Sequence, residues 1–179
     1  FPDNRSLFVH TLAGKLRRVD VQTGETRPVM DSDPTISYRD NRPNPDYSAD
    51  VVHSPDGSSI FYLSRDANTK LTRILTRTLD GGPEVDVCLI GVDAVVFGLS
   101  ISPDGRRLAY SNPTPVPGTG PKGSVWTVAT SGGEPREVYR STTQWLHDPA
   151  WSADAKRVLV FSGFQDGDIA IVPADGGEA

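Results

Sequence analysis

Residues 102–110 read Ser102-Pro103-Asp104-Gly105-Arg106-Arg107-Leu108-Ala109-Tyr110, a tight turn followed by an apolar strand, and the chain repeats this pattern. Ser54-Pro55-Asp56-Gly57 is a copy of the turn 48 residues earlier, and Ser152-Ala153-Asp154-Ala155 is a degenerate copy 50 residues later. Proline presets φ at the second position of such a turn, and glycine adopts the left-handed conformation that follows. A fixed period of this length is typical of proteins built from stacked repeats. The pattern therefore predicts a repeat architecture.

A second recurring signal fixes the content of each repeat. A Gly-Gly pair follows every copy of the turn, at Gly81-Gly82, Gly132-Gly133 and Gly176-Gly177. Such pairs favour hairpin turns that need positive φ, so each complete repeat is expected to hold four antiparallel strands. We expect strands at 6–11, 15–21 and 27–30; at 50–54, 59–64, 73–78 and 84–88; at 98–102, 107–111, 124–130 and 136–140; and at 148–152, 157–162 and 168–173.

The apolar pattern of the second strands distinguishes between architectures. Ile60-Phe61-Tyr62-Leu63 and Val158-Leu159-Val160-Phe161 are apolar at successive positions, hence on both faces of the strand. A two-layer sandwich would bury one face and show alternation, whereas sheets stacked radially as propeller blades are covered on both. We predict an all-β fold, a β-propeller of four-stranded antiparallel blades. About four repeats are visible, the first and last incomplete, in a single partial propeller over 1–179 with blades at approximately 1–30, 50–90, 98–140 and 148–179.

Several of these segments resemble the WD-like repeat of TolB-type β-propeller proteins. The similarity lies in residues 102–110, in Val125-Trp126-Thr127-Val128 with Gly132-Gly133-Glu134, and in His147-Asp148-Pro149-Ala150-Trp151-Ser152. It implies a periplasmic or secreted protein, although it leaves a cytoplasmic location open. It also implies a ring of six or more blades, which is more than this sequence shows. We expect either a fragment of a longer propeller, a ring closed by self-association or a tightly curled four-blade ring, because an open stack exposes strand edges and apolar faces.

Composition and charge exclude several other classes of protein. The chain has 179 residues and a net charge of −5, and its basic residues are scattered, which argues against a nucleic-acid partner. No apolar run approaches the length needed to span a bilayer, so no membrane insertion is expected. The single cysteine, Cys88, lies in an apolar run and is expected to be a small buried residue.

One candidate binding site is the channel mouth. Asp50 and Asp148 both stand four residues before a turn serine, at the expected start of an inner strand, and His53 and His147 are expected near the same mouth. Carboxylates there could hold a cation or a basic side chain of a partner. The alternative is solvated rim charge. Two histidines without a third ligand do not predict a metal site, so no metal and no cofactor is expected.

The segment 31–49 is the second candidate, because connections this long are usually functional or disordered. It carries Tyr38, Arg39, Arg42 and Tyr47, and tyrosine and arginine are enriched in binding hot spots. The alternative is a structural crossover. The proline-rich stretch 112–123 is expected to be an extended loop, and its Gly118-Thr119-Gly120-Pro121-Lys122-Gly123 is not a dinucleotide motif because no helix follows.

No catalytic motif stands out in the sequence. We therefore expect a non-enzymatic protein- or ligand-binding scaffold of the TolB-like type with a protein partner and no catalytic residues. The alternative is that these blades form the gating propeller of a larger hydrolase, such as a prolyl-oligopeptidase-like peptidase or an amidohydrolase.

Overall fold

The computed structural model describes residues 5–10, 16–29, 51–66, 68–116, 120–163 and 167–177. Within these ranges every regular element is a β-strand. The strands are β1 (Ser6–His10), β2 (Leu16–Asp20), β3 (Thr26–Pro28), β4 (Val51–His53), β5 (Ser59–Arg65), β6 (Leu71–Thr78), β7 (Val85–Val92), β8 (Leu99–Ile101), β9 (Arg107–Val116), β10 (Gly120–Ala129), β11 (Arg136–Arg140), β12 (Leu146–Trp151), β13 (Arg157–Ser162) and β14 (Asp168–Pro173).

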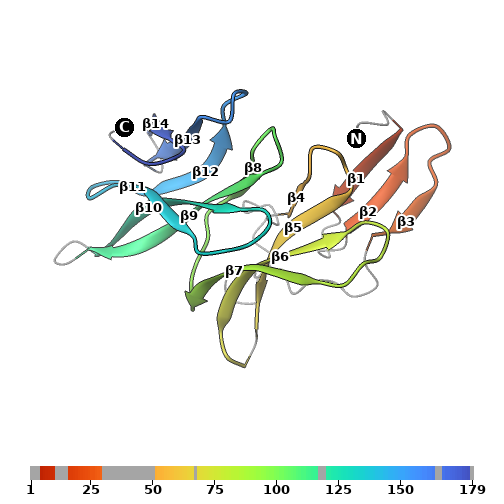
Figure 1. Ribbon diagram of the computed structural model, residues 1–179, viewed down its shortest axis with the longest axis horizontal. Helices are drawn as coiled ribbons and strands as arrows, with labels where there is room; N and C mark the ends of the chain where they lie inside the picture. Colours follow the sequence, from red (N-terminus) through yellow and green to blue (C-terminus); the bar gives the residue numbers. More distant parts are fainter. Residues whose placement is uncertain are drawn as a thin grey trace.

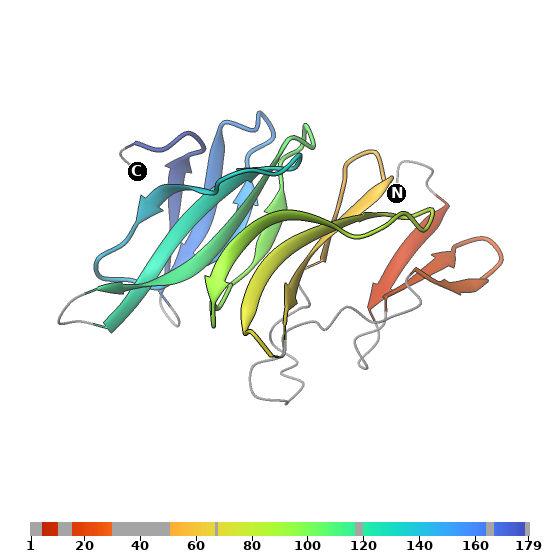
Figure 2. The ribbon, with the colours of Figure 1, turned by 60° about the horizontal axis from the view of Figure 1, so that its bottom comes forward.

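These strands form four antiparallel sheets, which we number sheet 1 to sheet 4 along the chain. Their orders are β1-β2-β3, β4-β5-β6-β7, β8-β9-β10-β11 and β12-β13-β14. Figure 1 and Figure 2 show them side by side in chain order, with sheets 1 and 4 at opposite ends of the row. The predicted all-β stack of propeller blades, with incomplete first and last repeats, is confirmed.

The repeated turn is held by one hydrogen-bond pattern. Ser102 Oγ donates to Asp104 Oδ1 over 2.6 Å and accepts the Arg107 N–H over 2.9 Å, while Gly105 has a φ of 71°. The turns that begin at Ser54 and Ser152 repeat these bonds. The recurrent aspartates thus cap turns. For Asp56, the hydroxyl of Ser54 and the backbone of Ser58 hold the carboxyl pKa down at about 2.

Alternate side chains of each second strand pack toward different neighbours. In β5, Ile60 and Tyr62 pack with Phe8 of sheet 1, whereas Phe61 and Leu63 belong to the core shared with sheet 3. In β9 the alternation recurs, and Ala109 joins a third core formed with Val158 and Val160 of sheet 4. Both faces of β5 are therefore covered, as its continuous apolar character predicted, whereas β13 buries Val158 and Val160 on one face and leaves Phe161 exposed on the other.

The proline-rich stretch departs from the predicted loop. β9 and β10 continue as a paired hairpin out to Val116 and Gly120, with Pro113 opposite Gly123 and Pro115 opposite Pro121. The inner strand β8 pairs with Leu108–Tyr110 of β9, so within the described part of the chain this extension has an open edge. Proline, which cannot donate to a ladder, is tolerated where its nitrogen faces such an edge.

Candidate functional site

The structure describes three of the predicted site residues. Asp50 and the predicted binding loop, with Tyr38, Arg39, Arg42 and Tyr47, lie outside the described residues. His53, His147 and Asp148 lie on the inner strands β4 and β12.

His147 and Asp148 form a small polar cluster at the beginning of β12. The imidazole Nδ1 lies 3.0 Å from the Asp148 carboxylate, Nε2 lies 2.8 Å from the Gly163 carbonyl, and the ring stacks on Phe161. Asp148 has a φ of 51° where the register of β12 against β13 shifts. A bulge of this kind re-aims a side chain out of the ladder, and the Asp148 carboxylate is exposed.

The backbone of Asp148 rests against sheet 3. Its N–H donates to the Phe97 carbonyl over 3.1 Å, and a Cβ at Gly98 would lie 2.9 Å from Asp148 Cα. Gly98 and Asp148 occupy equivalent positions, because each stands four residues before its turn serine. These two positions meet where sheet 3 packs against sheet 4. The sequence analysis expected the strand to start at Asp148, whereas β12 starts two residues earlier, at Leu146.

The two histidines do not share one mouth. His53 is the last residue of β4, directly before its turn, and its ring stacks on Phe8 of sheet 1 at a centroid distance of 4.1 Å. His147 lies five residues before the turn serine Ser152 and is paired with Phe161. They therefore occupy opposite ends of their inner strands, and that part of the prediction is wrong. A binding role for the cluster at His147 stays a prediction. The described part of the chain contains no group of three or more His, Cys, Asp or Glu residues placed to hold a metal ion.

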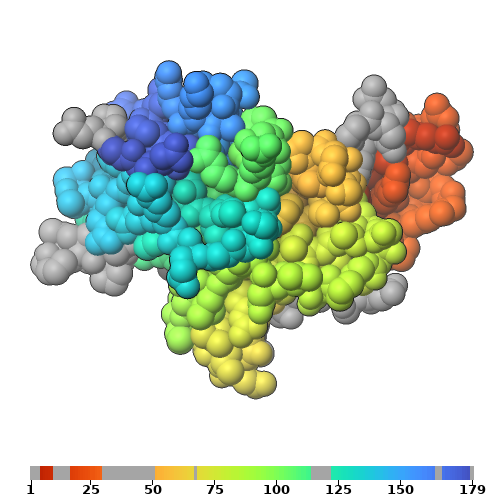
Figure 3. All heavy atoms as spheres, viewed as in Figure 1, coloured from red at the N-terminus to blue at the C-terminus, as the bar shows by residue number. Residues whose placement is uncertain are grey.

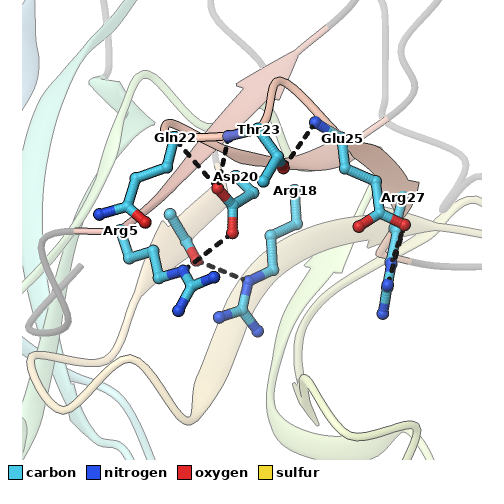
Figure 4. A network of polar contacts seen from close by, with 8 residues as sticks. Arg5, Arg18, Asp20, Gln22, Thr23, Glu25 and Arg27 are labelled. Atoms are coloured by element: carbon cyan, nitrogen blue, oxygen red, sulfur yellow. Dashed lines mark hydrogen bonds and ion pairs between the residues drawn. The ribbon is translucent and has the colours of Figure 1, made fainter.

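A polar pocket that the sequence analysis missed lies on sheet 1. Its volume is about 440 Å³, and it is lined by Arg5, Ser6, Arg18, Asp20, Glu25 and Arg27. Figure 4 shows the polar contacts among these residues, with the three arginines, Asp20 and Glu25 labelled. Strand pairing explains why these polar side chains lie together, because Ser6 is opposite Asp20 and Arg18 is opposite both Phe8 and Arg27. Directly opposed residues point to the same side of a sheet. The pocket therefore lies on the face of sheet 1 that carries Phe8 and looks toward sheet 2.

Short-range bonds organise the pocket. Arg5 pairs with Asp20 at 3.0 Å, Arg27 pairs with Glu25 at 2.8 Å, and Arg18 Nε donates to Ser6 Oγ over 2.9 Å. Asp20 also accepts the backbone N–H of Thr23, which is the main reason that its carboxyl pKa falls to about 2. Asp20 is therefore an anion at neutral pH.

The pocket combines three guanidinium groups with two carboxylates. Guanidinium groups bind carboxylates in a planar two-point geometry, so the arrangement suits an anionic side chain or sugar acid that competes with Asp20 and Glu25. In the sequence these residues are scattered, and no motif joins them. The pairing of β1, β2 and β3 brings these side chains to the same face of sheet 1. That pairing depends on the strand register, which the spacing of the residues in the sequence does not reveal.

Comparisons with known proteins support the fold. No protein-family model matches the chain, and no curated protein matches it. Among solved structures, TolB from Acinetobacter baumannii matches 99% of this chain and 40% of its own, with 13% identity and a TM-score of 0.69. A TolB-like protein from Agrobacterium tumefaciens matches 99% of this chain and 60% of its own, with 19% identity and a TM-score of 0.67. Oligogalacturonate lyase in complex with manganese matches 95% and 47%, with 18% identity and a TM-score of 0.64.

These likenesses establish the TolB kind of propeller as the fold of this chain. The chain spans between two fifths and three fifths of the two TolB chains. Because a lyase structure matches this chain as well, the fold by itself does not decide whether the chain is an enzyme. No helix in the described part of the chain could cross a membrane.

Proposed function

We propose that this chain is a non-enzymatic binding scaffold whose partner is a protein with an acidic surface segment. The pocket on sheet 1 carries the proposal, because it places three guanidinium groups around one hollow. Arginine is enriched at the energetic centres of protein interfaces. The similarity to TolB structures supports a scaffold of this type and a periplasmic or secreted location, which fractionation of cells expressing the tagged protein would test.

The ion pairs in the pocket are suited to exchange with a partner. The side chains of Arg5 and Arg27 and of Glu25 are largely exposed. Exposed ion pairs contribute about 0 to 1 kcal/mol each, so a partner carboxylate can replace Glu25 at little cost. Binding of this kind weakens as ionic strength rises.

Titration with a defined acidic peptide tests the proposal. We expect a fluorescent deca-glutamate peptide to bind the wild-type chain at low salt, and a deca-lysine peptide not to bind. The double variant R18E/R27E should weaken binding at least tenfold. Arg73→Glu is the matched control, since Arg73 also forms an exposed ion pair, at 3.5 Å to Asp86, but on sheet 2. Equal affinity of the two variants would refute the proposal.

A second candidate ligand is an acidic oligosaccharide. It is favoured by the same guanidinium groups together with the likeness to a structure of oligogalacturonate lyase. The same titration with oligogalacturonate in place of the peptide shows which of the two ligands the chain binds. The alternative that the blades gate a larger hydrolase stays a prediction, and the full-length open reading frame tests it by the presence of a hydrolase domain.

A further inference from the structure

The space between sheets 1 and 2 receives charged side chains from both sheets. The pocket described above lies on the face of sheet 1 that looks toward sheet 2, and Figure 3 shows these two sheets next to each other at one end of the molecule. On its side of this space, sheet 2 presents Ile60 and Tyr62, which pack with Phe8 of sheet 1. Arg77 is directly opposite Ile60 in the pairing of β5 with β6. Directly opposed residues point to the same side of a sheet, so Arg77 also faces sheet 1.

Arg77 stands at a position where the following sheets have a buried valine. In sheets 2, 3 and 4, the residue six positions after the turn serine pairs with one residue of the third strand. That partner is Val128 in sheet 3 and Val172 in sheet 4, whereas it is Arg77 in sheet 2. Val128 and Val172 are 4% and 0% exposed, because each packs against the preceding sheet. The interface between sheets 1 and 2 therefore has a cation where the other two interfaces have an apolar side chain.

The side chain of Arg77 is half-buried and held by one hydrogen bond. Its Nε donates to the Gly82 carbonyl over 2.9 Å. A guanidinium group has five N–H donors, so those on the two terminal nitrogens remain. Glu84, two residues beyond Gly82, accepts the Tyr62 hydroxyl over 2.6 Å, and among the described residues none forms an ion pair with Arg77. The terminal nitrogens of Arg77 can therefore bind a carboxylate that a ligand brings.

We propose that Arg77 is a further binding residue of this site, so that an acidic side chain of the partner protein lies between sheets 1 and 2. The inference rests on the function proposed above. Arg18 and Arg27 bind the acidic side chain from sheet 1, and Arg77 binds it from sheet 2. Like charges that face each other across an interface repel. One carboxylate relieves that repulsion, because its two oxygens have about four acceptor sites and can bond to two guanidinium groups.

Titration with the fluorescent deca-glutamate peptide at low salt tests the role of Arg77. Arg77→Val introduces the residue that sheets 3 and 4 have at this position, so we expect the fold to tolerate it. The variant should weaken peptide binding about fivefold to tenfold, because hydrogen bonds to charged groups contribute more than neutral ones. Arg77→Lys keeps the charge and should weaken binding less. Arg73→Val is the matched control and should keep the wild-type affinity, because Arg73 is four residues earlier on the same face of β6 and pairs with Asp86.

Protection from phenylglyoxal is the second measurement, and it uses the wild-type chain. This reagent modifies arginine side chains, so mass spectrometry should show that the bound peptide protects Arg77 and Arg18 and leaves Arg73 reactive. Wild-type affinity in Arg77→Val, or no protection of Arg77, would overturn the inference, and R18E/R27E then shows whether the pocket on sheet 1 binds the peptide alone. A wild-type chain that does not bind the peptide refutes the proposed function and this inference together. Arg77→Gln replaces Arg77→Val if the latter lacks the wild-type circular dichroism spectrum.

Discussion

Ser102→Ala removes the hydroxyl on which the repeated turn is built. Ser102 is fully buried, and its Oγ donates to Asp104 Oδ1 over 2.6 Å while accepting the Arg107 N–H over 2.9 Å. Alanine keeps the backbone and removes both bonds. Ser152→Ala removes the corresponding bonds, of 2.6 and 3.0 Å, from a turn that water reaches. Ser152 Oγ also lies 3.2 Å from the Arg157 carbonyl, so the two substitutions remove similar bonds and differ mainly in burial.

The expected cost follows from these bonds. A neutral hydrogen bond contributes about 0.5 to 1.5 kcal/mol and one to a charged group about 1.5 to 3 kcal/mol, and a buried group left without its bond costs more than an exposed one. We expect Ser102→Ala to lower the free energy of unfolding by about 2 to 3 kcal/mol. We expect Ser152→Ala to lower it by about 1 kcal/mol, because water replaces part of what is lost.

Urea unfolding followed by tryptophan fluorescence measures both values. Ser131→Ala, at an exposed serine in the turn between β10 and β11, is the control and should change the stability by less than about 0.5 kcal/mol. A cost for Ser102→Ala equal to that of the control, or smaller than that of Ser152→Ala, would refute the structural role given to the motif.

Three further predictions follow from buried and turn residues. Leu108→Ala, in the core between sheets 2 and 3, should cost about 2 to 5 kcal/mol in urea unfolding, whereas Leu89→Ala at an exposed site should cost under about 1 kcal/mol. Burial raises the Cys88 pKa to about 11, so Ellman's reagent at pH 8 should react slowly with the folded chain and quickly with the unfolded one; equal rates would contradict that burial. The lowered pKa of Asp56, about 2 against an ordinary 3.8, stabilises the fold above pH 4, and this contribution is lost as pH falls from 4 to 2. Asp56→Asn should therefore lose less stability than wild type across that window, and an identical loss would count against the turn bonds.

Much of the fold could be predicted because it is encoded locally. The tetrapeptide at Ser102 contains both the proline and the glycine that its turn requires, and the turn at Ser152 keeps the serine and aspartate that make the side-chain bonds. The successive apolar residues of β5 indicate burial on two sides, which a stack of sheets provides. Strand β11 at Arg136–Arg140 and strand β13 at Arg157–Ser162 match their predicted bounds.

Most features that were not predicted depend on which strands pair and in which register. The hairpin through Pro113 and Pro115 tolerates its prolines because, among the described strands, none pairs with the second edge of β9 there, which composition does not reveal. The close approach of Gly98 to Asp148 depends on how sheets 3 and 4 pack, which the sequence does not reveal. The pocket on sheet 1 requires the register of three strands. The opposite placement of His53 and His147, by contrast, follows from the sequence, because they stand one and five residues before their turn serines.

Methyl nuclear Overhauser contacts between sheets test the central claim most directly. The claim is that successive sheets stack face to face, with Ala109 and Val125 of sheet 3 against Val158 and Val160 of sheet 4. Spectra of the methyl-labelled chain should show cross-peaks between these two pairs. Absence of those cross-peaks, with Ile169 and Ile171 contacting sheet 3 in their place, would contradict the stack.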